Sequence, residues 1–75
     1  MAYKPKKRSL TIAGHRTSIS LEDDFWAALK DMAEAQGRTV PAIIATIDAT
    51  RGLCALSSAI RSAILAHFRT GVRED

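Results

Sequence analysis

The side chains with the clearest potential for chemistry lie near the N-terminus. From residue 16 to residue 21 polar and less polar side chains alternate, and the more polar ones are Arg16, Ser18 and Ser20. Successive side chains of a strand point to opposite faces, so these three should share one exposed face. Arginine can bond O6 and N7 of guanine, serine can bond either base type, and a two-stranded ribbon fits the major groove of DNA. We therefore expect Arg16, Ser18 and Ser20 to contact bases, with Arg16 as the strongest candidate.

Other groups could hold the phosphate backbone of DNA. Residues 1–8 lack periodicity and predict a flexible basic arm, followed by a single domain over residues 9–75. The unpaired N–H groups at the start of a helix headed by Thr39 form a second candidate anion site. The predicted phosphate contacts are Lys4, Lys6, Lys7, Arg8, His15, Arg38, Thr39 and Val40. Such contacts release counterions, so binding should depend strongly on salt.

The distribution of charge also favours a polyanion at the N-terminal end. The chain has 75 residues and a net charge of +3, but residues 1–16 hold five basic and no acidic side chains. A chain of this length predicts one small domain with a marginal core, which a homodimer would extend. No apolar run is long enough for a membrane span or a signal peptide, so we expect a cytoplasmic, nucleoid-associated protein.

Catalytic, metal and cofactor chemistry has little support in the sequence. His15 and His67 are far apart, and no Cys or His lies at ligand spacing from either. The sequence has no Ser-His-Asp, Cys-His or glycine-rich phosphate motif. The single cysteine, Cys54, has apolar neighbours that predict a packing role. We expect no catalytic residues, no metal and no cofactor.

The elements that position the candidate groups are expected to be one strand and three helices. The strand covers residues 16–21, and a first helix runs from near Glu22 to Gly37 with apolar side chains at helical spacing. Ser20 and Asp23 have the spacing of a capping box at the start of this helix. Thr39 is expected to cap a second helix that Gly52 closes. A third helix should run from residue 57 or 58 to about residue 70, before a glycine at position 71.

A single strand with one buried face needs a partner. The simplest partner is the same strand of a second molecule, which predicts a mainly α fold with one strand per chain and an antiparallel ribbon between subunits. Residues 9–12 also alternate before Ala13 and Gly14, so a second strand folding back through a turn stays open. The predicted dimer core consists of Thr17, Ile19, Leu21, Phe25, Leu29, Met32, Ile43, Ile44 and Ile47.

From residue 16 to about residue 51 the sequence resembles bacterial ribbon-helix-helix DNA-binding proteins. The resemblance rests on T-S-I-S-L-E, F-W-A-A-L-K-D-M-A-E-A-Q-G and G-R-T-V-P-A-I-I. More narrowly, G-H-R-T-S-I-S-L-E with F-W and L-S-S-A-I-R looks like a subfamily of small bacterial proteins. It implies a ribbon-helix-helix homodimer with an additional C-terminal helix, which regulates transcription by placing Arg16, Ser18 and Ser20 in the major groove. The resemblance also implies that the start of the family's second helix clamps a phosphate. Two segments resemble that helix, the one headed by Thr39 and L-S-S-A-I-R-S-A-I-L, so either helix start could be the clamp.

Other functions remain open at this point. A protein-interaction module, such as an antitoxin or adaptor, could use the apolar face of the third helix, which comprises Leu56, Ile60, Ile64, Leu65 and Phe68. A sensor could bind an anionic nucleotide between basic residues doubled at a two-fold axis. The protein could also be an architectural DNA-binding protein. Such a protein would differ from a regulator only in the ratio of its affinity for a specific site to its affinity for other DNA.

Overall fold

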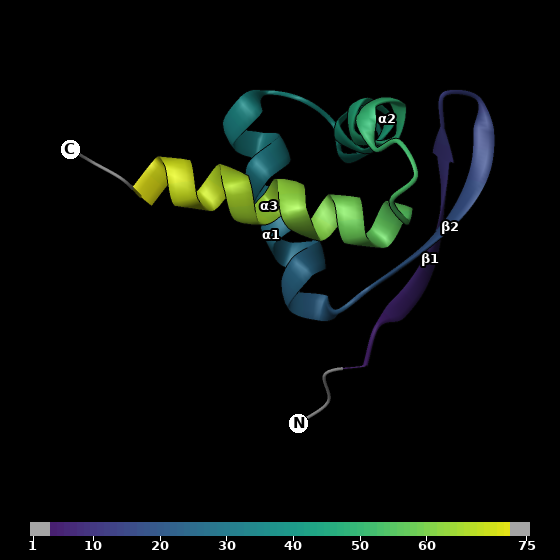
Figure 1. Cartoon of the computed structure of the whole chain (residues 1–75), viewed down its shortest axis with the longest axis horizontal. Coiled ribbons are helices and arrows are strands. Elements are labelled where there is room, and N and C mark those ends of the chain that lie inside the picture. The colour runs from purple at the N-terminus through teal and green to yellow at the C-terminus, as the bar shows by residue number, and fades with distance from the viewer. Residues whose placement is uncertain (1–3, 73–75) are drawn as a thin grey trace.

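A computed structural model describes residues 4–72 of the chain. Two strands precede three helices, with β1 at Lys6–Ile12, β2 at His15–Leu21, α1 at Asp23–Gln36, α2 at Val40–Thr50 and α3 at Leu56–Val72. The strands form a hairpin at one side of the helices, and the C-terminal half of α3 extends away from it (Figure 1). No helix in residues 4–72 combines the length and the apolar character needed to cross a bilayer.

The hairpin is closed by a two-residue turn within the chain. Ala13 and Gly14 both have positive φ, at 52° and 85°, as a type I′ turn requires. The strands pair antiparallel from Ile12 with His15 to Lys6 with Leu21. The prediction of one strand per chain is therefore wrong, because β2 takes its partner from the same molecule. Residues 6–8, which the sequence predicted as part of a flexible arm, lie in β1.

One face of the hairpin, called here the inner face, packs against the helices. Ile12, Ile19 and Leu21 are buried there, while Leu10 and Thr17 are half-buried. Strand β1 contacts α2, and β2 contacts α3. The predicted inward side of β2 is thus confirmed, although it joins a core within one chain.

Helix α1 begins without a side-chain cap. The carbonyl of Glu22 accepts hydrogen bonds from the N–H groups of Phe25 and Trp26, both at 3.0 Å, so the predicted capping box does not form. Gly37 ends the helix with φ +65°, a left-handed conformation that costs glycine little. Of the apolar stripe, Leu29 and Met32 are buried and Phe25 is half-buried against the core.

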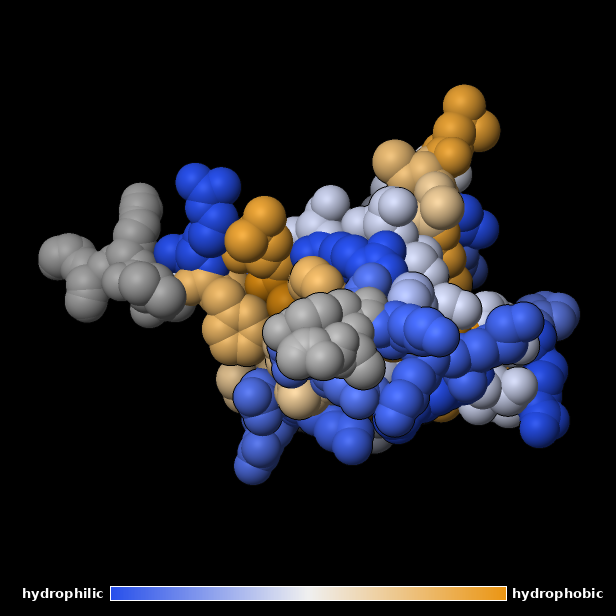
Figure 2. Space-filling model, turned by 90° about the horizontal axis from the view of Figure 1, so that it is seen from below, coloured by the Kyte–Doolittle hydropathy of each residue, from blue (hydrophilic) through white to orange (hydrophobic). Residues whose placement is uncertain are grey.

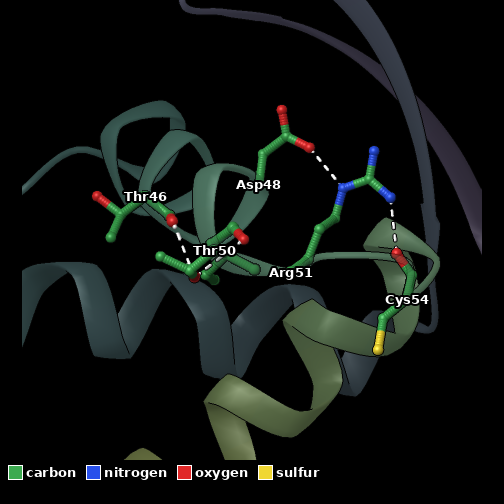
Figure 3. A network of polar contacts seen from close by, with 6 residues as sticks. Thr46, Asp48, Thr50, Arg51 and Cys54 are labelled. Carbon is green, nitrogen blue, oxygen red and sulfur yellow. Dashed lines mark hydrogen bonds and ion pairs between the residues drawn. The ribbon is translucent and has the colours of Figure 1, made fainter.

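Hydrogen bonds between residues close together in the sequence lie at both ends of helix α2. The Thr39 hydroxyl accepts from the Ala42 N–H at 3.2 Å, which confirms the predicted cap. Beyond the helix, Arg51 donates to Asp48 Oδ1 and to the Cys54 carbonyl, both at 2.6 Å, and so holds the loop toward α3 (Figure 3). Cys54 itself is exposed, so the prediction that it packs in the core is wrong.

Helix α3 contributes to the core with its N-terminal half. Ile60 and Ile64 are buried among side chains of α1, α2 and the hairpin, and Ile43, Ile44 and Ile47 of α2 are buried with them. The helix continues to Val72, beyond the end at about residue 70 that the sequence predicted. Leu65 and Phe68 are 57% and 38% exposed, so only part of the apolar face of α3 is covered.

Candidate nucleic-acid interface

The second face of the hairpin, called here the outer face, is entirely polar. The strand register places the side chains of opposite residues on the same side, so β1 and β2 contribute three residues each. These residues are Lys7, Ser9, Thr11, Arg16, Ser18 and Ser20. Ser20 is half-buried, and the other five are exposed. Within residues 4–72 none of these six side chains has a hydrogen bond or an ion pair to the protein, so their polar groups are available to a ligand.

Basic residues on the inner face have partners in the protein. Lys6 Nζ lies 3.4 Å from Asp23 Oδ2, and the Arg8 guanidinium lies over the Trp26 ring at 4.9 Å from its centroid. The Trp26 indole also donates to the Lys6 carbonyl at 3.4 Å. Lys6 and Arg8, both predicted as phosphate contacts, are therefore separated from Lys7 by the alternation of the strand.

Two contacts tie the hairpin to α1 and α3 where β2 ends. Ser57 Oγ, at the start of α3, donates to the Ser20 carbonyl at 3.0 Å. Arg61 donates to Glu22 Oε1 through Nε and Nη2, at 3.0 and 2.9 Å. A hydrogen bond from its own backbone N–H lowers the pKa of Glu22, and the bond from Arg61 lowers this pKa further. These contacts fix the orientation of the outer face relative to the helices.

The start of α2 is a separate candidate site. Arg38 donates to the Thr46 hydroxyl at 2.6 Å and to the Ala42 carbonyl at 3.1 Å, so its guanidinium is directed along α2. Thr39 caps the helix, and Val40 is half-buried against the core. None of the three predicted phosphate contacts at this helix start belongs to the outer face. Lys4 precedes β1 and His15 follows the hairpin turn, and both are exposed.

A groove between the helices has a different chemistry from the outer face. It has a volume of about 600 Å³ and an apolar lining that includes Met32, Ile43 and Ile47. The polar side chains of the lining include Arg38, His67 and Gln36. Gln36 Nε2 lies 3.5 Å from His67 Nδ1. Among the described residues no group of three or more His, Cys, Asp or Glu side chains could hold a metal ion.

Ser9 and Thr11 of the outer face were not predicted as site residues. Their signal in the sequence is the alternation of Ser9, Leu10, Thr11 and Ile12, which indicated only a possible second strand. Once β1 pairs with β2, Ser9 lies opposite Ser18 and Thr11 lies opposite Arg16. The structure thus adds β1 side chains to the three predicted on β2.

A short antiparallel ribbon with a polar exposed face, followed by packed helices, defines a class of small nucleic-acid-binding domains. The ribbon-helix-helix domain family matches residues 5–68, and the chain belongs to this family. Domains of this family generally bind DNA in transcription regulation and are typically not enzymes. The match includes β1, which lies outside the residues that carried the resemblance, and most of α3. No curated protein and no solved structure matches the chain.

Proposed function

We propose that this protein binds double-stranded DNA in a sequence-dependent manner through the outer face of its hairpin and thereby regulates transcription. The observation that carries the proposal is the exposed, wholly polar outer face, on which Arg16 has no partner among the described residues. The major groove is about 12 Å wide and admits a two-stranded ribbon. Arg16 would then bond a guanine edge, while Ser18 and Ser20 contact neighbouring bases.

A selection from random duplexes tests this function. The protein is incubated with a random-sequence duplex pool at low and at physiological salt, and bound DNA is sequenced. We expect an enriched motif that persists at physiological salt. Salt-sensitive binding without enrichment would favour an architectural role, and no binding by the folded protein would contradict the proposal.

We further propose that the functional form is a homodimer, as is typical of the family. Its support in this chain is the small core together with apolar side chains left exposed on α3, and Figure 2 shows such side chains gathered beside the C-terminal end of that helix. Sedimentation of the free and DNA-bound protein measures its mass.

We also propose that the protein is bacterial and cytoplasmic and associates with the nucleoid, which fractionation with the chromosome would test. We propose in addition that it belongs to the subfamily of small bacterial proteins.

The exposed Leu65 and Phe68 favour one second candidate, a module that binds another protein through α3. The double substitution Leu65→Ser with Phe68→Ser separates the two functions. If α3 binds another protein, this variant loses that partner but keeps its own mass in solution and the DNA motif. If α3 forms the functional homodimer, the variant becomes monomeric and its binding to the selected motif weakens.

A further inference from the structure

We infer that the groove between the helices is a binding site for a small carboxylate with an apolar tail, and that the carboxylate group contacts Arg38. The inference goes beyond the proposed function, because no residue that lines the groove belongs to the outer face of the hairpin. Its support is the size of the groove, the chemistry of its walls and the fixed position of one arginine.

The C-terminal half of α3 forms one wall of the groove. Its lining residues lie three or four positions apart and so share one face of the helix, and they are Ala63, Ala66, His67 and Thr70. The other walls come from α1, from α2 and from Arg38 between them. The small alanines of α3 leave space between the helices. The volume of about 600 Å³ is typical of small-molecule sites, which range from about 300 to about 1,000 Å³.

The apolar walls of the groove suit an alkyl tail. Met32, Ile43 and Ile47 belong to the hydrophobic core and also line the groove, so this part of the lining continues the core. Each CH₂ group that a ligand buries on such a surface strengthens binding by up to about fourfold. A tail of several carbons therefore contributes much more than a single methyl group.

Arg38 gives the groove its charge. Among residues 4–72 it is the only Lys, Arg, Asp or Glu that lines the groove, and no acidic side chain there forms an ion pair with it. Its backbone N–H donates to the Ala33 carbonyl at 2.9 Å, and its Nη2 donates to Thr46 and Ala42. Within residues 4–72 its Nε and Nη1 have no hydrogen bond, so these donors remain for a carboxylate.

The other polar groups of the lining favour a ligand with one negative charge. Gln36 Nε2 lies 3.5 Å from His67 Nδ1. An amide nitrogen only donates, so Nδ1 accepts and a neutral His67 carries its proton on Nε2, as a second donor in the lining. One full positive charge and one neutral donor match a carboxylate better than a phosphate group, which carries nearly two charges.

The test uses octanoate as the probe and follows the amide NMR spectrum of the full chain. Acetate has the same charge without the tail, and octanol has the tail without the charge. We expect octanoate to shift the signals of groove residues such as Thr46 and Ala63 and to leave the outer face unchanged. Octanol should bind at least about tenfold more weakly, because it lacks the charged partner of Arg38. Acetate should show no measurable binding.

Two variants of the groove have matched controls. Arg38→Gln removes the charge of the groove, and Arg69→Gln removes the same charge from an exposed position of α3 outside the lining. Ala66→Phe fills the groove from an exposed position, whereas Ala66→Ser keeps the space. We expect Arg38→Gln and Ala66→Phe each to weaken octanoate binding at least about tenfold. Both controls should bind as the wild type does, and the amide spectrum reports whether each variant is folded.

The outcomes either support or overturn the inference. Weaker binding by both folded groove variants, with unchanged binding by both controls, supports it. If octanol binds as tightly as octanoate, or if Arg38→Gln binds as the wild type does, the role of Arg38 is overturned. If octanoate shifts no groove signal, the inference is overturned, and a changed mass of Ala66→Phe in sedimentation would then identify a second copy of the chain as the occupant. None of these results involves DNA, so the proposed function is tested separately.

Discussion

The two faces of the hairpin carry basic residues one position apart, yet these residues have different surroundings. Lys6 and Arg8 on the inner face contact Asp23 and Trp26 of α1. Lys7 on the outer face has no such partner in the part of the chain that the structure describes. The basic residues of β1 therefore have two different roles. Lys6 and Arg8 contact α1, whereas the charge of Lys7 remains available to a polyanion.

The largest expected difference between the faces is in stability. Ile19 is only 2% exposed on the inner face, so Ile19→Ala should lower the free energy of unfolding by about 2–5 kcal/mol through lost burial and a cavity. Its neighbour Ser18 is exposed, and Ser18→Ala should change stability by no more than about 0.5 kcal/mol. Urea denaturation of both variants measures this contrast. Equal losses would show that the hairpin is not docked as described.

The next difference is in DNA binding. Arg16→Ala should weaken binding to the selected motif by about 1–3 kcal/mol and relax preference at the contacted base pair. Arg8→Ala should cost about 0.5–1 kcal/mol of stability through its lost contact with Trp26, with the motif unchanged. Titrations against matched and mismatched duplexes distinguish the two variants. A motif lost with Arg8 and kept without Arg16 would reverse the assignment of the faces.

A third prediction concerns the turn that creates both faces. Gly14 has φ +85°, and a Cβ atom added there would meet nothing within 4 Å, so Gly14→Ala should destabilise the hairpin by about 1–2 kcal/mol through backbone strain alone. Gly14→Asn is the matched control, because asparagine tolerates this conformation better. Thermal unfolding followed by Trp26 fluorescence measures both. A stability loss in Gly14→Asn as large as that in Gly14→Ala would exclude strain at this φ as the cause.

The smallest expected effect is the pH dependence at the junction of the hairpin with the helices. The pKa of Glu22 lies below its ordinary value of 4.5, so its carboxylate stabilises the folded chain above that pH. This contribution is lost as the pH falls through the lowered pKa. Between about pH 6 and about pH 3 the wild type should therefore lose more stability than Glu22→Gln. Parallel pH profiles of the free energy of unfolding for the two proteins would contradict a lowered pKa of Glu22.

The helices and the strand β2 were predictable because their signals are local. The apolar spacing from Phe25 to Met32, the capping hydroxyl of Thr39 and the alternation that ends at Leu21 each act within a few residues. The inward side of β2 followed from the same alternation. For the site, Arg16 and Ser18 were placed correctly on the exposed face.

Strand β1 was obscured because its inward row begins with charged residues. Lys6 and Arg8 face the helices, and their partners Asp23 and Trp26 come from α1, so the row reads as apolar only at Leu10 and Ile12. The turn signal was also weak, since Ala13 adopts a positive φ that alanine disfavours. Missing β1 left β2 without its in-chain partner and omitted Ser9 and Thr11 from the outer face.

The most direct test of the hairpin whose outer face is proposed to bind DNA is a cross-link between its two strands. Leu10 and Thr17 form an inner-face pair, and hydrogen-bonded pairs have Cα atoms about 5.5 Å apart, within the range of a disulfide. Leu10→Cys with Thr17→Cys, in a Cys54→Ser background, should oxidise within single chains, and the oxidised protein should bind the selected duplex as tightly as the reduced one. Cross-links between two chains would contradict the in-chain hairpin, and DNA binding lost on oxidation and restored on reduction would contradict binding by the outer face of the intact hairpin.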